Sequence, residues 1–210
     1  MPLTDIRPVK AALREKYRNI RTSMTADEKE NYDKTIAGQV RSLWQYDKND
    51  TLLVYVSTPI EVDTHEIIEQ ALLDGKKVAV PRCVDGTRNM EFYFIGSLDD
   101  LEPGSFGVLE PIVEKTELMT DFSRGLCIVP AFSYDWSGFR LGYGKGYYDR
   151  FLSRFDGNII GICYSSCVQR SLPHGRFDRP VELLVTEKYL RRTNRPLERR
   201  RFNEQRTTNR

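Results

Sequence analysis

The segment LCIVPAFSYDWSGFRLGYGKGYYDRFL, residues 126–152, contains three successive patterns: an apolar run, a glycine-rich loop and a helical stretch. The apolar run at 126–132 is typical of a buried central strand. Four glycines then fall within nine residues, at 138–146, and the stretch beginning at Tyr147 predicts a helix. A strand, loop and helix in this order indicate an α/β unit, in which ligands bind beyond the carboxyl ends of parallel strands. The segment therefore predicts both the fold class and the place of a ligand site.

The same alternation of strands and helices extends over most of the chain. Helices are expected at 4–24, 25–44, 63–75 and from 147 onward, and strands at 51–57, 76–82, 90–96, 126–132, 158–165 and 181–187. Residues 97–124 are rich in proline and glycine and are expected to be a loop. These elements predict an α/β fold with a mostly parallel sheet and helices on both faces, an open three-layer sandwich.

Individual residues predict where several of the helices and strands begin or end. Thr4 or Asp5 is expected to cap the first helix, and Thr25 with Glu28 forms a capping box for the second. Asp63 is expected to cap the third helix, which Gly75 ends. The second predicted strand, at 76–82, is expected to end at Pro81.

Composition restricts the class of protein. The chain has 210 residues, of which 40% are hydrophobic and 30% charged, as in a soluble globular domain. No apolar run approaches the roughly 18 residues that span a bilayer, and the first ten residues lack the apolar core of a secretory signal. The four cysteines form no CxxC pair and are expected to be reduced and buried, without structural zinc: Cys83, Cys127, Cys163 and Cys167. We therefore expect a cytoplasmic protein with no membrane association.

The charge is unevenly distributed. Residues 191–210 contain eight arginines and two glutamates and carry a charge of +6, whereas the whole chain carries +2. The sequence thus predicts one domain at 1–190 followed by a basic, disordered tail at 191–210. The tail is interpreted as a solvated extension rather than an arm for RNA, because the body shows no basic stripe for nucleic acid.

The glycine loop suits an anion. Glycines let backbone N–H groups approach a phosphate, and Arg140 and Lys145 add positive charge. The loop is not a Walker A motif, because Gly146 stands where a serine or threonine would hold Mg²⁺. Its GxGxG spacing also differs from the dinucleotide fingerprint. Taken alone, it remains either a phosphate site or a structural turn with exposed charge.

The residues from Arg140 to Asp149, RLGYGKGYYD, closely resemble the signature of the 5-formyltetrahydrofolate cyclo-ligase family, approximately R-L-G-x-G-x-G-Y-Y-D. The resemblance continues in order over residues 8–190, through Lys10, Leu13 and Arg14, and through VYVSTPIEVDT, VAVPR, FGVLEP and VELLVTE. It implies a fold resembling the sugar-phosphate isomerase and CoA transferase-like group. It also implies ATP- and Mg²⁺-dependent conversion of 5-formyltetrahydrofolate to 5,10-methenyltetrahydrofolate.

The resemblance also implies roles for particular residues. Lys145 and Arg140 are the candidates for stabilising the phosphoryl group during transfer. ATP is expected to contact Lys10, Arg14, Arg140, Leu141, Gly142, Tyr143, Gly144, Lys145, Gly146, Tyr147 and Tyr148. Asp149 and Glu182 are the candidate Mg²⁺ carboxylates, although the family commonly has aspartate at the second position and Mg²⁺ geometry is strict.

The implied folate site includes Glu61, whose carboxylate would accept hydrogen bonds from the pterin. The other candidates are Val56, Tyr143, Gly144, Lys145, Gly146 and Tyr147, with Phe106 nearby. Packing that anchors the loop is the alternative role for the two tyrosines.

Two other functions remain open. A paralogue with this fold would use ATP on a different substrate, and an RNA-binding module would use the arginine-rich tail. The expected partner is a small molecule, a folate that carries one or more glutamates, and not nucleic acid. The chain is expected to act as a monomer.

Overall fold

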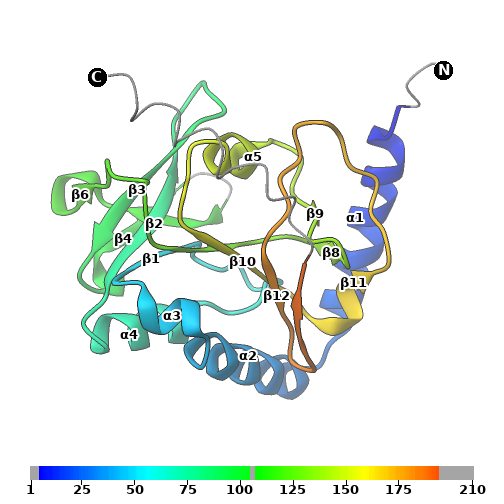
Figure 1. Ribbon diagram of the computed structural model, residues 1–210, viewed down its shortest axis with the longest axis horizontal. Coiled ribbons are helices and arrows are strands. Elements are labelled where there is room, and N and C mark those ends of the chain that lie inside the picture. Colours follow the sequence, from blue (N-terminus) through cyan, green and yellow to red (C-terminus); the bar gives the residue numbers. More distant parts are fainter. Residues whose placement is uncertain (1–4, 105–106, 194–210) are drawn as a thin grey trace, which may run out of the picture.

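An eight-stranded sheet forms the centre of the protein, whose computed structural model describes residues 5–104 and 107–193 (Figure 1). Its strands are β1 (Thr51–Val54), β2 (Lys77–Cys83), β3 (Met90–Ile95), β6 (Glu117–Leu118), β7 (Leu126–Val129), β10 (Asn158–Ile162), β12 (Leu183–Val185) and β13 (Leu190–Arg192). The order is β13-β12-β10-β7-β1-β2-β3-β6. The five strands from β12 to β2 are parallel, and β13, β3 and β6 add antiparallel edges. The mostly parallel sheet expected from the sequence is confirmed.

Helices cover both faces of this sheet. They are α1 (Arg7–Thr22), α2 (Ala26–Arg41), α3 (Trp44–Lys48), α4 (His65–Leu73) and α5 (Tyr147–Leu152). Figure 1 shows α2, α3 and α4 along one side of the sheet and α5 on the other. Phe151 of α5 packs on Phe92 of β3 with ring centroids 4.5 Å apart. The parallel strands are buried on both faces, which explains why they appear in the sequence as continuous apolar runs.

A three-stranded sheet lies against the main one. It has the order β11-β8-β9 and consists of β8 (Ser133–Asp135), β9 (Arg140–Leu141) and β11 (Val168–Gln169). The Tyr134 hydroxyl donates to the Val129 carbonyl at 2.7 Å, and the Tyr134 ring lies directly over Gly161 of β10. Helix α1 packs against β9. These contacts fix the start of the glycine loop relative to the main sheet.

The segment 97–124, expected to be a loop, contains more regular structure than predicted. Strands β4 (Leu101–Pro103) and β5 (Leu109–Pro111) form a hairpin, and β6 adds to the main sheet. Two short 3-10 helices, Leu98–Asp100 and Val113–Lys115, flank the hairpin. Such short strands lack the long apolar period that makes a strand recognisable.

Strand β2 does not end at Pro81, contrary to the prediction. It continues to Cys83, paired with β3. Pairing with β1 stops at Ala79, so at Pro81 the strand has a neighbour only on the β3 side. Proline is tolerated there because no hydrogen bond to a second strand is lost.

The helix ends agree with the sequence at α2 and at the end of α4, where Gly75 follows the C-cap with a φ of +77°, and they differ at the starts of α1 and α4. Thr25 and Glu28 form the expected capping box. Helix α4 has Thr64 as its N-cap without a side-chain bond, and Asp63 instead accepts from the His65 N–H at 3.0 Å. The residue before helix α1 is Ile6, which has no side-chain cap, but the Asp5 carboxylate accepts from the Arg7 N–H at 3.0 Å. Residue 4 lies outside the described residues.

The remaining sequence predictions concern the cysteines and the tail. All four cysteines are free, and Cys127, Cys163 and Cys167 are buried. Within the described residues, no helix is long and apolar enough to cross a membrane. Strand β13 extends the sheet to Arg192, just past the boundary expected at 190, and the rest of the tail, residues 194–210, lies outside the described residues.

Candidate active site

The candidate site lies where the chain changes direction across the main sheet. From β1 the chain continues to β2 on one side, whereas from β7 it continues to β10 on the other. Adjacent parallel strands whose connections diverge leave a crevice at their carboxyl ends, the usual ligand position in open α/β sheets. The segment after β1 carries Glu61, and the segment after β7 leads to the glycine loop. The fold thus brings together two motifs about 80 residues apart, with Glu61 and Tyr143 separated by 82 positions.

Glu61 is held by the turn that contains it. Its Oε2 accepts from the Thr58 backbone N–H at 2.8 Å and from the Thr58 hydroxyl at 2.9 Å, and the Glu61 N–H donates to the Thr58 carbonyl. Glu61 is only 5% exposed. A buried carboxylate needs such donors to offset its lost hydration. Val56, another predicted folate residue, is buried directly after β1.

Tyr143 of the glycine loop reaches Glu61. Its hydroxyl donates to the Oε1 atom of Glu61, and its ring lies 4.5 Å from that of Phe132, centroid to centroid. Burial and the nearby Glu61 carboxylate raise the pKa of the Tyr143 phenol above its usual value. A tyrosine hydroxyl is protonated at neutral pH and can donate this hydrogen bond. The structure therefore joins two of the residues predicted for folate binding in one hydrogen bond.

Helix α1 supplies cations from one face. Arg14 Nε donates to the Gly142 carbonyl at 2.7 Å, and Lys10 Nζ pairs with Asp178 at 2.6 Å. These residues are four positions apart and share a helix face, as the sequence predicts. Arg14 therefore contacts the glycine loop directly, whereas Lys10 contacts the segment before β12.

The same helix face continues to Arg21, which the sequence analysis did not single out. Arg21 is buried, and its guanidinium donates to the carbonyls of Ile60, Ala131 and Phe132. It thus joins the segment after β1 to the segment after β7. The spacing of seven from Arg14 was the available signal, because seven residues are close to two helical turns.

Arg140 and Asp149 form an ion pair at the base of the loop. Arg140 Nη2 lies 2.6 Å from Asp149 Oδ1, and Arg140 Nη1 donates to the Arg179 carbonyl at 2.8 Å. The Arg179 N–H also donates to Asp149 Oδ1, at 3.2 Å. The Arg140 side chain is almost fully buried. In this structure Arg140 thus fixes the start of helix α5 relative to the segment before β12.

The glycine loop itself is open to solvent. Tyr143, Gly144 and Lys145 are exposed, and a side chain at Gly142 or Gly146 would meet no atom within 4 Å. Gly144 and Gly146 have φ of +96° and +76°, which other residues rarely adopt. A solvent-exposed glycine-rich backbone next to Lys145 and Arg14 fits the phosphates of a nucleotide.

Carboxylates for a metal are sparse. Both hydrogen bonds to Asp149 use Oδ1, and the Glu182 carboxylate accepts from Asn158 Nδ2 at 3.4 Å, beside the start of β10. In the part of the chain that the structure describes, no three His, Cys, Asp or Glu side chains form a group able to hold a metal. A single carboxylate fits Mg²⁺ that arrives on nucleotide phosphates and keeps its waters, rather than a metal bound by protein alone.

The other predicted residues lie around the loop. Leu141 is buried in β9, and the Tyr147 hydroxyl is 3.4 Å from the Thr87 carbonyl. The Tyr148 hydroxyl is buried and has no hydrogen-bond partner among the described residues, and burial raises its pKa. Phe106 lies outside the described residues.

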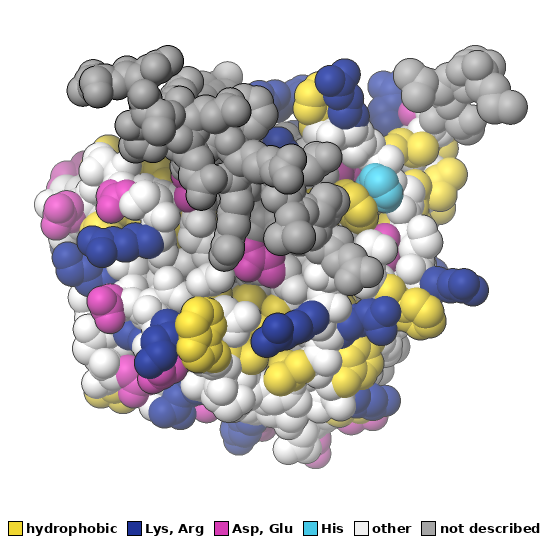
Figure 2. Space-filling view, in the orientation of Figure 1, with side chains coloured by type: hydrophobic (Ala, Val, Ile, Leu, Met, Phe, Trp, Pro, Cys, Tyr) yellow, Lys and Arg dark blue, Asp and Glu magenta, His cyan; other side chains and the backbone are white. Residues whose placement is uncertain are grey.

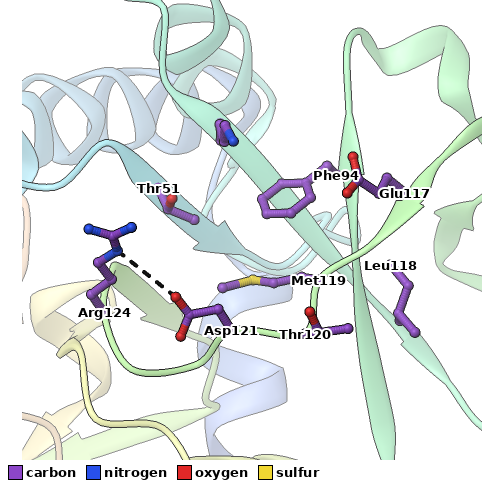
Figure 3. A pocket seen from close by; sticks show the side chains of 9 residues that line it. Thr51, Phe94, Glu117, Leu118, Met119, Thr120, Asp121 and Arg124 are labelled. Carbon is purple, nitrogen blue, oxygen red and sulfur yellow. Dashed lines mark ion pairs between the residues drawn. The ribbon is translucent and has the colours of Figure 1, made fainter.

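A separate cavity of about 180 Å³ lies at the opposite edge of the sheet (Figure 3). Thr51 and Lys77 at the amino ends of β1 and β2 line it, together with the segment 117–121 and Arg124. Arg124 and Asp121 face each other across 4.0 Å. The cavity contains none of the predicted site residues, so it does not coincide with the candidate site.

Comparison with known proteins gives a consistent picture. Residues 6–187 match the model of the 5-formyltetrahydrofolate cyclo-ligase family. A probable 5-formyltetrahydrofolate cyclo-ligase of Schizosaccharomyces pombe is 32% identical over 174 residues, which cover 75% of this chain and 85% of that protein. A mitochondrial 5-formyltetrahydrofolate cyclo-ligase of Arabidopsis thaliana is 30% identical and covers 86% of this chain and 73% of its own length.

A solved structure supports the same relationship. The 5,10-methenyltetrahydrofolate synthetase of Aquifex aeolicus superposes with a TM-score of 0.76 at 32% identity, over 92% of this chain and 98% of its own. The enzyme of the same description from Mycoplasma pneumoniae, at 20% identity and a TM-score of 0.68, shares the fold.

Proposed function

The chain belongs to the 5-formyltetrahydrofolate cyclo-ligase family, and we propose that it converts 5-formyltetrahydrofolate to 5,10-methenyltetrahydrofolate, with release of ADP and phosphate. The observation that carries the proposal is the meeting of the two motifs. Tyr143 of the glycine loop donates a hydrogen bond to Glu61 where the connections from β1 and β7 diverge. Glu61 is suited to a pterin and the glycine loop to phosphates. A reaction that transfers a phosphoryl group to a folate needs both binding functions side by side.

The chemistry explains why a nucleotide is needed. The formyl oxygen on N5 is a poor leaving group, and ATP supplies the phosphoryl group that activates it as an iminium phosphate. The N10 amine then attacks the activated carbon and loses its proton, and the C–O bond breaks as phosphate departs. The enzyme must therefore hold N10 near the formyl carbon and stabilise the charge on the transferring phosphoryl group.

We assign the nucleotide to the loop and helix α1. The backbone N–H groups of the glycine loop, together with Arg14, would bind phosphates, and Lys145 would stabilise the transferring group. Lys10 would contribute once it exchanges Asp178 for a phosphate. Arg140 would contribute mainly by positioning the loop, because its guanidinium is paired with Asp149. Asp149 would support Mg²⁺ through its second oxygen or through water.

We assign the pterin to the crevice beside Glu61. The buried Glu61 carboxylate would accept N–H groups of the pterin, while Val56 would line the pocket and Tyr143 and Tyr147 would border it. Glu61→Gln is expected to weaken folate binding and to leave binding of Mg-ATP intact. The reverse pattern, measured by calorimetry with each ligand, would exclude Glu61 from the pterin site.

The decisive test is absorbance of the methenyl product. Purified protein is mixed with 5-formyltetrahydrofolate and Mg-ATP, and parallel samples omit ATP or Mg²⁺. A rise that needs both additions supports the proposal. No rise in protein that still binds Mg-ATP would favour the alternative, a paralogue that phosphorylates another formyl or acyl compound.

The remaining expectations are part of the proposal. We propose a monomer in the cytoplasm, to be checked by light scattering and by cell fractionation. The RNA-binding alternative has less support, because Figure 2 shows basic side chains interspersed with acidic and apolar ones where the described residues are visible on this face. Truncation after Thr193, which keeps β13, would remove RNA binding and spare turnover if the tail alone bound RNA.

A further inference from the structure

Both carboxylate oxygens of Glu61 already accept hydrogen bonds within the chain. Oε2 accepts two bonds from Thr58, and Oε1 accepts the Tyr143 hydroxyl. Because Glu61 is 5% exposed, little solvent reaches the carboxylate by another route. A ligand that approaches Oε1 from the side of the glycine loop must therefore displace the Tyr143 hydroxyl.

We propose that Tyr143 acts as an internal competitor that closes the glycine loop over Glu61 until a folate displaces its hydroxyl. This inference rests on the proposed function, since it assumes that Glu61 receives the pterin. In the closed state the phenol satisfies the buried carboxylate, and in the open state the N–H groups of the pterin do so. The exchange keeps Glu61 hydrogen-bonded in both states, so that neither state leaves a buried acceptor unsatisfied.

The local backbone suits such a movement. Tyr143 lies between Gly142 and Gly144, and Gly144 already has a φ of +96°, so the chain on both sides of the tyrosine has wide conformational freedom. Tyr143 is 45% exposed, although its hydroxyl reaches a buried carboxylate. The ring can thus turn outward into solvent without first displacing packed side chains on its exposed side.

Two contacts define the closed position. Arg14 Nε binds the Gly142 carbonyl at 2.7 Å, and the Tyr143 ring rests against Phe132 at 4.5 Å. Neither contact needs the hydroxyl. Arg14 would keep the base of the loop near α1 while Tyr143 turns. Removing only the hydroxyl therefore tests the competition and leaves the ring contact and the Arg14 contact in place.

The test is Tyr143→Phe, measured by equilibrium binding of 5-formyltetrahydrofolate without ATP. Because the ligand no longer replaces an internal hydrogen bond, its Kd is expected to fall about threefold to tenfold. The association rate should rise by a similar factor if loop opening limits entry. An unchanged or higher Kd would overturn the proposal, since it would mean that the hydroxyl assists binding or plays no part.

The matched control is Tyr46→Phe. Tyr46 donates its hydroxyl to the Asp74 carboxylate at 2.7 Å, between α3 and the end of α4. This variant removes the same kind of bond at a place outside the candidate site. Its folate Kd should equal that of the natural chain, and a shift like that of Tyr143→Phe would show that the effect is not specific to Glu61.

A second readout needs no ligand. Amide hydrogen exchange of residues 142–146 in the free protein should be faster in Tyr143→Phe than in the natural chain, because the loop has lost its contact with Glu61. Equal exchange would overturn the closed state even if binding changed. If the natural chain neither binds nor converts the folate, the proposed function fails, whereas the exchange result still decides whether Tyr143 holds the loop.

Discussion

Lys145 stands at the centre of the glycine loop, exposed to solvent. If it stabilises charge on the transferring phosphoryl group, Lys145→Ala should lower kcat about 100- to 1000-fold, the usual loss for such a group. The Kd for folate should change little, because the side chain acts mainly in the transition state. Steady-state turnover and equilibrium binding measure the two effects separately.

Lys115→Ala is the control for this prediction, since Lys115 is an exposed lysine in the 3-10 helix at residues 113–115. Its kcat should match that of the natural chain. Full turnover in Lys145→Ala would remove Lys145 from the chemistry and leave the loop backbone and Arg14 as the phosphate contacts.

His65 and Asp63 form a pair next to the turn that carries Glu61. His65 Nδ1 lies 2.6 Å from Asp63 Oδ1, and Ser57 Oγ donates to the same oxygen. A hydrogen bond to His65 lowers the pKa of Asp63, and the bond to Asp63 raises the pKa of His65. The Asp63 contribution is lost as pH falls through its lowered pKa. The His65 contribution is complete below about pH 6.5 and is lost as pH rises through its raised pKa.

His65→Gln should therefore lower the melting temperature more at pH 5.5 than at pH 9. Both side chains are more than a third exposed, so solvent screens the pair and the difference should be only about 1–3 °C. Thermal unfolding at the two pH values measures it. In an Asp63→Asn background the same substitution should show no such pH dependence, and a pH-independent loss in both backgrounds would contradict the charged pair.

At the residue scale, the sequence singled out side chains that the structure brings together, but it did not predict the contacts between them. Glu61, Tyr143 and Arg14 were expected to contact ligands, and in the structure they contact one another or the loop backbone. Arg140 and Asp149 were assigned separate roles, yet they form one ion pair. Residue type indicates the chemistry that a side chain can perform, whereas its partner depends on tertiary packing.

At the element scale, helix α2 offers a clean test of local sequence signals. The Thr25 hydroxyl oxygen accepts from the Glu28 N–H at 3.2 Å, and the Glu28 carboxylate accepts from the Thr25 N–H at 3.0 Å. Thr25→Ala removes the cap and should reduce the free energy of unfolding by about 1 kcal/mol. Urea unfolding measures the change.

Thr35→Ala in the same helix is the matched control. Thr35 is exposed in the helix interior and its hydroxyl bonds only the Asn31 carbonyl. Alanine has the higher helix propensity, so this variant should be neutral or slightly stabilising. Equal losses in both variants would show that the cap has no special contribution.

Strands with a continuous apolar run could be predicted from the sequence. Short strands that form only by pairing with a distant strand could not. The apolar runs at β1, β7 and β10 identify these strands from sequence because both of their faces are buried. The hairpin β4–β5 and the edge strand β6 have three residues or fewer per strand, and their structure depends on partners distant in sequence. The predicted end of β2 at Pro81 was wrong for the same reason. A proline is tolerated in this strand only because β1 stops pairing with it at Ala79.

At the scale of the whole molecule, the site depends on how two sheets are joined. The order of the main sheet places the ends of β1 and β7 side by side, and the small sheet carries the glycine loop toward them. The alternation of strands and helices predicted that the main sheet would be mostly parallel. Strand order and the docking of a second sheet were not predictable, because they depend on contacts such as that between Tyr134 and Gly161.

Gly161→Ala tests this joint. A Cβ at Gly161 would lie 2.4 Å from the Tyr134 ring, so either the ring or β10 must shift. Overpacking of this kind costs about 1–3 kcal/mol of unfolding free energy. Because Tyr134 is in β8, which pairs with β9 at the start of the loop, turnover should also fall, with KM for folate and for ATP both raised.

Gly38→Ala separates this effect from a general response to added methyl groups. Gly38 lies within α2 with no atom within 4 Å of the position of a Cβ, so alanine there should raise the free energy of unfolding by about 0.5–1 kcal/mol and leave KM unchanged. A Gly161→Ala protein that loses stability but keeps both KM values would show that the loop keeps its position without the small sheet. Loss of both would mean that the spacing between the sheets positions the site, because the Cβ acts on the contact between them and touches no residue assigned to ATP or folate.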